Sequence, residues 1–331
     1  MQKRESFILV PGGAGYIGSQ TCKYLKQSGY TPISYDNLST GHKEAVKWGP
    51  FELGDVKDRA RLIEVIQKYK PIAVMNFAAS IAAGESVIHP GKYYNNNLVG
   101  TLTLLDVMVE MDIKNIVFSS TAAVYGDPIK LPIDEEHPLK PINPYGSSKL
   151  MIEQILADYH HSYNLKYAAL RYFNAAGSDL ELETGCSHEK PGNLIPIIMQ
   201  VLSRHIAELK VYGNDYDTED GTAIRDYIHV VDLAKAHILA LEYILNDKGC
   251  LTVNLGTGLG SSVKEIIENV ETITGQSINY SYAARREGDA PILVANSDKA
   301  QAVLGWQAKH SDIKTIIDSA WQWHKTLHNL N

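Results

Sequence analysis

Tyr145 and Lys149 are the two residues whose chemical types and spacing point most directly to catalysis, in the string Tyr145-Gly146-Ser147-Ser148-Lys149. Residues four positions apart share one face of a helix. A free tyrosine has a pKa of about 10, so its phenolate is scarce at neutral pH. A neighbouring ammonium group favours the phenolate and would make Tyr145 a usable general base. The same spacing also arises by chance on solvated helices. Other parts of the chain must therefore show whether Tyr145 and Lys149 are catalytic.

A glycine-rich turn near the amino terminus supplies that context. The apolar run Ile8–Val10 predicts a buried strand, and a periodic helix over Gly18–Gln27 follows it. Glycine is required where such a turn is tight and where a pyrophosphate must approach the backbone, and the helix N-terminus then presents N–H groups to the phosphates. The glycines fit both G-x-x-G-x-x-G and G-x-G-x-x-G: Gly12, Gly13, Gly15 and Gly18.

A carboxylate follows the next predicted strand. The strand Thr31–Tyr35 ends in Asp36, eighteen residues after Gly18. A carboxylate at this place accepts hydrogen bonds from the adenosine ribose of NAD and repels the 2′-phosphate of NADP. The alternative is a turn-forming role in Asp36-Asn37, which is common for aspartate. The combination of glycines, strand and carboxylate predicts an NAD site.

Composition narrows the class of protein. The chain has 331 residues, of which 44% are hydrophobic, so it can bury a large core. The net charge of −7 without a basic run speaks against nucleic-acid binding, and no segment has the length and apolar character of a membrane span or a signal peptide. Cys22, Cys186 and Cys250 are scattered without metal-ligand spacing, which predicts a cytoplasmic protein and no metal site.

The order of elements predicts the fold class. Strands alternating with helices indicate an α/β fold with a doubly wound parallel (Rossmann) sheet, whose ligands bind at the carboxyl ends of the strands. A smaller carboxyl-terminal domain is expected, with helices over Val263–Thr274 and Ile313–Lys325. We expect the NAD-binding domain to span 1–176 with a return segment near 226–256, and the substrate-binding domain to span 177–225 and 257–331. The remaining predicted strands are Ala73–Asn76, Asn115–Ser119 and Tyr167–Tyr172, and the remaining helices are Leu62–Tyr69, Gly100–Met111 and Tyr145–Tyr163.

Nearly the whole chain resembles the extended short-chain dehydrogenase/reductase family, and within it the enzymes that epimerise nucleotide sugars at C4. The string YFNAAG at 172–177 together with DGTAIRDYIHVVDLA at 220–234 carries the resemblance to the epimerases. The other matching strings are GGAGYIG at 12–18, YDNLSTGH at 35–42, GDVKD at 54–58, FAA at 77–79, GESV at 84–87, NPYGSSK at 143–149 and NLGTG at 254–258.

This resemblance implies a reaction and roles. A UDP-sugar would be oxidised at C4 by tightly bound NAD and reduced again on its other face, which interconverts UDP-glucose and UDP-galactose. Tyr145 would remove the 4-hydroxyl proton, Lys149 would bind the nicotinamide ribose and lower the tyrosine pKa, and Thr121 would hydrogen-bond the sugar O4. Without the resemblance, Thr121 could equally cap backbone at the end of its strand. A homodimer is the expected assembly.

The resemblance also implies two sets of binding residues. The cofactor set consists of Gly12, Gly15, Tyr16, Ile17, Gly18, Asp36, Asn37, Leu38, Ser39, Thr40, Gly41, Asp55, Val56, Phe77, Ala78, Ala79, Asn97, Thr121, Tyr145, Lys149 and Phe173. The substrate set consists of Thr121, Tyr145, Asn174, Asn193, Leu194, Tyr212, Arg225, Arg286, Asp289 and Leu293. The two arginines would bind the diphosphate as planar, permanently charged donors, although Arg225 could instead pair with the adjacent Asp226. His229, within an apolar run, is interpreted as a packing residue.

Other proteins with the same fold have different activities, and each activity requires particular residues. A 4,6-dehydratase or a UDP-glucuronate decarboxylase needs an acidic residue beside the hydroxyl residue, whereas Ala122 and Ala123 follow Thr121. A 4-epimerase of UDP-pentoses or of UDP-N-acetylhexosamines is not excluded, because Leu293 has an intermediate size at a position that gates N-acetylated sugars. A catalytically silent NAD sensor would not require Thr121, Tyr145 and Lys149 together.

Three positions depart from the family pattern near the cofactor, and one is Thr121, which replaces the more common Ser and keeps the hydroxyl group while adding a methyl group. Pro11 precedes the glycines where Thr or Ser is usual, so that position has neither a hydroxyl group nor an N–H, which could loosen the turn. Ile81 stands where several relatives carry a lysine, so no charged phosphate contact is expected there.

Overall fold

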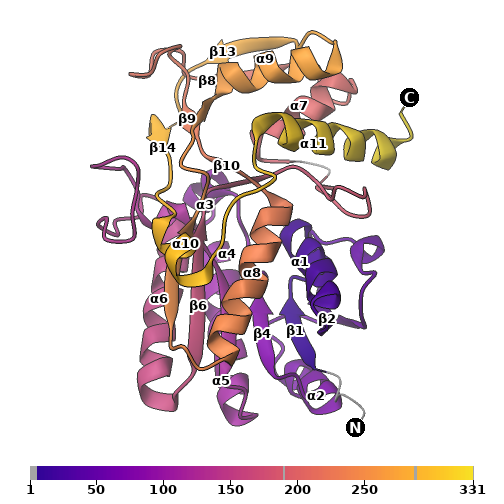
Figure 1. The fold of residues 1–331 in the computed structure, drawn as a ribbon, viewed down its shortest axis with the longest axis vertical. Coiled ribbons are helices and arrows are strands. Elements are labelled where there is room, and N and C mark those ends of the chain that lie inside the picture. The colour runs from indigo at the N-terminus through magenta and orange to yellow at the C-terminus, as the bar shows by residue number, and fades with distance from the viewer. Residues whose placement is uncertain (1–5, 189–190, 287–288, 331) are drawn as a thin grey trace. The chain divides into compact units, whose positions relative to one another are not determined.

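The computed structural model describes residues 6–188, 191–286 and 289–330, and these fall into two compact units (Figure 1). The first unit comprises the chain up to Gly126 together with Leu139–Arg171 and Ala234–Val253. The second comprises Asp127–Pro138, Tyr172–Leu233 and the chain from Asn254 onward. Compared with the expected domains, residues 127–138 and 172–176 lie in the second unit, and the return to the first unit runs over Ala234–Val253.

Backbone hydrogen bonds explain why residues 127–138 belong to the second unit. The N–H of Ile133 donates to the carbonyl of Val294 at 2.8 Å, and the N–H of Asn296 donates to the carbonyl of Ile133 at 2.7 Å. The side chain of Asn254 also donates to Ile133, at 2.9 Å. These partners lie more than 100 residues away in sequence, so local sequence patterns could not reveal them.

A seven-stranded sheet forms the centre of the first unit, in the order β11-β6-β5-β4-β1-β2-β3. Strand β1 pairs in parallel with β2 and β4, β2 with β3, and β4 with β5. The predicted doubly wound α/β fold is therefore confirmed. The strands are β1 (Phe7–Pro11), β2 (Thr31–Asp36), β3 (Phe51–Leu53), β4 (Ala73–Asn76), β5 (Asn115–Thr121), β6 (Lys166–Tyr172) and β11 (Leu251–Leu255).

Helices cover both faces of this sheet. Helices α2, α5 and α6 pack on one face, where Leu62, Leu104 and Leu156 join a core with sheet residues such as Ile33 and Phe118. Helices α1 and α8 lie side by side on the other face (Figure 1), and the Nζ atom of Lys235 is 5.6 Å from the centre of the Tyr24 ring. The helices are α1 (Tyr16–Gln27), α2 (Arg59–Tyr69), α5 (Gly100–Glu110), α6 (Pro144–Tyr163) and α8 (Val230–Leu245).

Short helices extend the connection between β4 and α5. It contains α3 (Ala83–Ile88), α4 (Pro90–Tyr93) and the π-helical turn η2 (Tyr94–Val99), which runs directly into α5. Two 3₁₀ turns, η1 (Lys43–Ala45) and η3 (Ala122–Val124), follow β2 and β5. Because parallel strands bring their carboxyl ends to one edge of the sheet, the residues after β1, β2, β4 and β5 meet there.

The second unit has its own core. Helices α7, α9 and α11 pack together with β8 and β10, burying Ile198, Ile266, Ile316 and Trp321. Its strands are β7 (Asn174–Ala176), β8 (Leu209–Tyr212), β9 (Ile224–Arg225), β10 (Tyr227–His229), β12 (Ser261–Ser262), β13 (Tyr280–Ala283) and β14 (Ile292–Leu293). Its helices are α7 (Leu194–Leu202), α9 (Val263–Thr274), α10 (Asp298–Leu304) and α11 (Ile313–His328). No helix in the described ranges has the length and apolar character of a membrane span.

Candidate active site

The turn between β1 and α1 requires glycine at positions 12, 13 and 18. Gly12 has a φ of 79°, and a Cβ atom there would lie 2.7 Å from the backbone nitrogen of Ala78. A Cβ atom on Gly18 would overlap the carbonyl oxygen of Gly12. The glycines therefore allow the first turn of α1 to pack directly against the β1 turn.

The N-terminus of α1 is suited to an anion. Gly15 occupies the N-cap position and has no side chain that could accept hydrogen bonds from the first turn, which also carries no acidic residue. The first N–H groups of an α-helix have no partners within the helix, and the helix dipole favours negative charge at this end. This geometry fits the pyrophosphate of a dinucleotide.

Asp36 ends β2 with its side chain only 8% exposed. Its Oδ2 atom accepts a hydrogen bond from the N–H of Ala14 at 3.0 Å, and its Oδ1 atom accepts one from Leu38 at 2.9 Å. Burial raises the pKa of Asp36, and the bonds from Leu38 and Ala14 oppose that rise. A carboxylate offers about four acceptor positions, so Asp36 both fixes the glycine turn and keeps capacity for ribose hydroxyls.

The segments after β2 and β3 converge beside Asp36. The side-chain amide of Asn37 donates to Asp55 at 3.0 Å. A Cβ atom on Gly41 would lie 3.0 Å from Asp36 Oδ1, and Leu38 takes a left-handed φ of 58°. Val56 is nearly buried. The structure thus brings together the residues that were predicted on the adenosine side, with Ser39 and Thr40 exposed.

Residues after β4 are held by the sheet and by η2. The N–H of Phe77 donates to Pro11 at 2.8 Å, so the carbonyl of Pro11 still joins β1 to the β4 segment. Asn97 is 1% exposed, and its amide donates to Ser80 at 3.0 Å and to Ser148 at 3.1 Å. Both amide hydrogens of Asn97 are used, so it would act on the cofactor site by bracing the 77–80 segment against α6. Ala78 and Ala79 are half-buried in that segment, and Ile81 is exposed.

Thr121 and Tyr145 meet at the end of β5. Thr121 is 7% exposed, and its hydroxyl accepts a hydrogen bond from the N–H of Ala123 at 3.2 Å, so it does cap backbone. The same hydroxyl bonds the Tyr145 side chain. Tyr145 lies in the first turn of α6, where the Asn143 cap accepts the N–H of Gly146 at 2.9 Å and fixes the helix start. The hydroxyl groups of Thr121 and Tyr145 are thus placed next to each other at the end of β5.

Lys149 lies one turn further along α6 and is 3% exposed. Its Nζ atom donates to the carbonyl of Ser119 at 2.8 Å and lies 4.8 Å from the centre of the Phe118 ring. Burial lowers the pKa of Lys149 to about 7, and the charge of Glu153 opposes that fall. Burial raises the pKa of Tyr145, and the Thr121 bond opposes that rise. The tyrosine pKa therefore moves opposite to the direction expected from an adjacent ammonium group, because desolvation outweighs the hydrogen bond with Thr121.

Arg171 and Glu153 form a buried ion pair that sequence reasoning missed. Glu153 lies one helical turn after Lys149 on α6. Arg171 on β6 donates to Glu153 on α6, with 2.6 Å between Nη2 and Oε2 and 3.0 Å between Nε and Oε1. Ser120 donates to the same carboxylate, and Arg171 also donates to the Tyr125 hydroxyl at 2.9 Å. The sequence signal was the spacing: Glu153 follows Lys149 by one helical turn.

Replacing Glu153 by Gln is expected to destabilise the fold by about 3–5 kcal/mol, because Arg171 would remain buried without its counter-ion. Loss of the carboxylate should also lower the Lys149 pKa further, so the alkaline limb of the pH–rate profile should move to lower pH if turnover needs the ammonium form. Urea denaturation and pH–rate profiles measure the two effects. Glu110→Gln, which breaks an exposed pair with Arg59, is the control and should cost at most about 1 kcal/mol. Equal losses for both variants would contradict the prediction.

In the second unit, Arg225 does not pair with Asp226. Its guanidinium group bonds the carboxylate of Asp289 and donates to the carbonyl of Ile224 at 2.7 Å. Asp226 is fully buried and accepts the N–H of Thr257 at 2.8 Å instead. The local ion pair considered from the sequence is therefore wrong, and the arginine bonds a distant residue.

Two further members of the predicted substrate set adjoin this pair. Leu293 on β14 is the register partner of Arg225 on β9 in a parallel pair, so their side chains share one face. Arg286 lies over the Tyr212 ring, 4.0 Å from its centre, and Tyr212 is 37% exposed. Leu293 is therefore placed beside the candidate diphosphate contacts.

The other substrate-set residues sit at element ends. Asn193 is the exposed N-cap of α7, but its side chain makes no capping hydrogen bond, so the amide is available to a ligand. Leu194 packs against the core of the second unit. Asn174 begins β7 and donates from its N–H to Asp226 at 3.0 Å, while Phe173 precedes it half-buried.

Two histidines are structural. His229 is fully buried, with Nε2 3.0 Å from the Ser319 hydroxyl and Nδ1 accepting the N–H of Val231 at 3.1 Å. Its burial and these two hydrogen bonds confirm the packing interpretation, and burial lowers its pKa to about 4. His237 on α8 bonds Ser119 at 3.2 Å and contacts the Phe77 ring, so it supports two segments of the candidate site.

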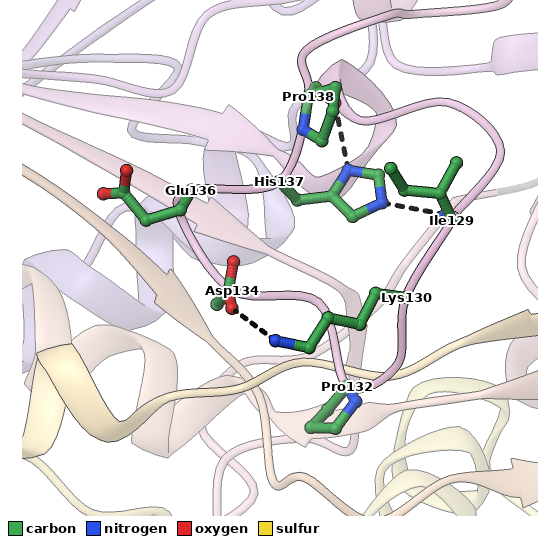
Figure 2. A pocket seen from close by; sticks show the side chains of 7 residues that line it. All are labelled: Ile129, Lys130, Pro132, Asp134, Glu136, His137 and Pro138. Atoms are coloured by element: carbon green, nitrogen blue, oxygen red, sulfur yellow. Dashed lines mark hydrogen bonds and ion pairs between the residues drawn. The ribbon is translucent and has the colours of Figure 1, made fainter.

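A shallow pocket of about 200 Å³ lies within 129–138 of the second unit. Figure 2 shows His137 turned inward, with Nε2 accepting the N–H of Ile129 at 2.9 Å. Lys130 pairs with Asp134 at 3.7 Å. No member of the predicted catalytic or binding sets lines this pocket, so it carries no candidate chemistry.

Residues 8–256 match the NAD dependent epimerase/dehydratase family. The chain belongs to this family. The match spans the glycine turn, the Asp36 position and the Thr121–Tyr145–Lys149 group, which are the features described above.

Members of the family are similar to this chain over nearly its whole length. The UDP-glucose 4-epimerase of Rhizobium meliloti is 51% identical over 317 residues, which cover 96% of each chain. The crystal structure of the UDP-glucose 4-epimerase from Brucella ovis in complex with NAD is 50% identical, with a TM-score of 0.94 over 96% of this chain and 98% of that one. A UDP-glucose-4-epimerase from Stenotrophomonas maltophila, with bound NAD and formylated UDP-arabinopyranose, is 37% identical, with a TM-score of 0.94 over 98% and 99%.

Proposed function

We propose that this protein interconverts UDP-glucose and UDP-galactose by epimerisation at C4, with NAD held throughout the reaction. The hydrogen-bonded hydroxyl groups of Thr121 and Tyr145, with Lys149 one helical turn away, are the observation that carries this proposal. UDP-glucose 4-epimerases that match over nearly the full length support it.

The first unit contains residues that fit NAD. The side-chain-free turn at Gly12 and Gly18 leaves room for the pyrophosphate at the N-terminus of α1, and Asp36 would accept the ribose hydroxyls. Lys149 would bind the nicotinamide ribose by exchanging its present bond to the Ser119 carbonyl. When bound, NAD supplies the hydride acceptor for C4 and is regenerated when the hydride returns.

The proton in this reaction would move through Thr121 and Tyr145. Tyr145 would take the proton of the sugar 4-hydroxyl as general base, and Thr121 would orient O4 through its own hydroxyl. The positive charge of Lys149 would stabilise the phenolate as it forms, and would thereby act against the rise in the tyrosine pKa that burial causes. After the keto sugar turns over, Tyr145 would return the proton.

The second unit would hold the nucleotide. Arg225, Arg286 and Asp289 are proposed to bind the diphosphate and ribose of UDP. The guanidinium group of Arg225 is oriented by Asp289 and by the Ile224 carbonyl. Planar, permanently charged donors suit a phosphate that is removed from water. Asn174, Asn193, Leu194, Tyr212 and Phe173 are proposed to complete the nucleotide and nicotinamide contacts.

Incubation of the purified protein with UDP-galactose, without added NAD or reductant, tests the function. We expect UDP-glucose to accumulate to equilibrium and only a minor bound fraction to absorb as NADH. Steady NADH production in proportion to substrate would instead identify a dehydrogenase. Loss of water from the sugar would identify a dehydratase, which the alanines after Thr121 disfavour.

Leu293 is proposed to gate the C2 substituent of the sugar, since it lies beside Arg225 on one face. Leu293→Tyr should abolish turnover of UDP-N-acetylhexosamines, which we expect to be weak in the natural protein, and largely spare UDP-glucose. Overpacking costs about 1–3 kcal/mol, which corresponds to roughly ten- to a hundredfold in selectivity. The ratio of kcat/KM for plain and N-acetylated sugars measures the effect. An unchanged ratio would mean that another residue is the gate. UDP-pentoses are the second candidate substrates, and their turnover is measured in parallel.

We also propose a homodimer. Large apolar side chains are exposed on neighbouring elements of the first unit: Val87 is 60% and Ile88 73% exposed on α3, Val99 is 44% exposed on η2, and Met151 is 41% exposed on α6. Exposed apolar side chains gathered in this way are typical of a protein interface. Light scattering should give twice the chain mass, and Ile88→Glu should yield monomer. A monomeric natural protein would contradict this assembly.

A cytoplasmic location is proposed because all three cysteines are unpaired thiols.

A further inference from the structure

Three histidines of the second unit come together outside all the residues discussed so far. His324 and His328 lie one turn apart on α11, and His205 follows α7. One ring nitrogen from each lies within 4.8 Å of the others. The His328 ring centre is 4.4 Å from that of His324 and 4.6 Å from that of His205.

The cluster is held by the backbone and by a shared hydroxyl. The N–H of His205 donates to the carbonyl of Gln200 at 2.9 Å, which fixes the turn after α7. The Ser203 hydroxyl is 2.7 Å from Nδ1 of His205 and 2.8 Å from Nε2 of His324. Within the part of the chain that the structure describes, no hydrogen bond involves the second nitrogen of either ring, Nε2 of His205 and Nδ1 of His324. Hydrogen bonds that fix the orientation of the ligating imidazoles are a general feature of the outer shell of metal sites.

The surroundings of the cluster disfavour protonation of His324 and His328. Burial, then the neighbouring His328 and His205, lower the pKa of His324 to about 4. Burial and His205 also lower the pKa of His328. Neutral imidazole is the form that ligates metals. Helices α7 and α11, which lie side by side in Figure 1, both end at the cluster, and helix C-termini favour positive charge.

We propose that His205, His324 and His328 bind a divalent first-row transition metal such as Zn²⁺, which ties the end of α11 to the turn after α7. Zinc takes histidine nitrogens at about 2.0–2.1 Å, so the three ligand atoms must draw together by roughly an ångström. Exposed rings of His205 and His328 can move by that amount, while His324, stacked on Trp321, stays in place. Solvent would supply the fourth ligand.

Titration of tag-free, chelator-treated protein with Zn²⁺ in a calorimeter tests the proposal, and Co²⁺ replaces Zn²⁺ for visible spectroscopy. We expect one Zn²⁺ per chain, a Co²⁺ spectrum of histidine coordination and a higher Tm with Zn²⁺. His205→Gln and His328→Gln each remove one exposed ligand and should weaken binding by about tenfold or more, as should Ser203→Ala through the outer shell. His161→Gln, an exposed histidine on α6, is the matched control and should bind as the natural protein does.

Two outcomes would overturn the proposal. One is the absence of saturable Zn²⁺ binding to the natural protein. The other is binding with the same affinity and stoichiometry in His205→Gln and His328→Gln. Epimerase activity serves only to show that each variant is folded, because none of these side chains belongs to the catalytic or binding sets. The metal site therefore stands or falls independently of the proposed function.

Discussion

Replacing Tyr145 by Phe is expected to reduce turnover by about a hundredfold or more, the usual effect of deleting a positioned general base. The substitution removes one oxygen atom and leaves the ring to fill the same half-buried space on α6. Bound NAD should be retained, because the first turn of α1 and Asp36 are untouched. Single-turnover reduction of the bound NAD by UDP-galactose, together with steady-state kcat, measures the loss.

A matched control lies on the same helix. Tyr163→Phe makes the same chemical change at a side chain that is 48% exposed near the end of α6, and it should leave kcat within about twofold of the natural value, since surface changes have small effects. Near-normal turnover in Tyr145→Phe would mean that another group accepts the proton. An equal loss in both variants would point to damage of α6 rather than to lost catalysis.

Gly18→Ala is expected to weaken NAD binding by roughly ten- to a hundredfold. The added Cβ atom would overlap the carbonyl oxygen of Gly12, so either the turn or the start of α1 must shift. Overpacking of this kind costs about 1–3 kcal/mol, and each 1.4 kcal/mol is about tenfold in affinity. The protein should purify with less NAD, which release by denaturation and absorbance can quantify, and its Tm should fall accordingly.

Gly91→Ala is the control for this experiment. Gly91 lies in α4 of the same unit, where a Cβ atom would meet nothing within 4 Å, so NAD content and Tm should be unchanged or slightly raised. Full NAD content in Gly18→Ala would show that the turn can relax around the extra methyl group, and that the close approach of α1 to Gly12 is not required for binding.

The sequence alone determined the order of elements and the cofactor side of the site. The strand β1, the glycine turn, α1 and Asp36 follow one another within about thirty residues, so turn chemistry and hydrophobic period suffice to predict them. The pair Tyr145 and Lys149 was readable for the same reason, because a helix places residues four apart on one face. Short pieces such as β3 and η2 were missed, because they hold too few residues to show a period.

Only the tertiary structure decided the charge states and the partners of these residues. The pKa of Lys149 falls to about 7 and that of Tyr145 rises because surrounding elements exclude water from both side chains. Arg225 bonds Asp289 rather than its neighbour Asp226, and residues 127–138 join the second unit through Val294 and Asn296. Desolvation and long-range pairing depend on elements far apart in the chain, whereas helix period and turn chemistry depend on neighbours, which is why the sequence predicted the latter and not the former.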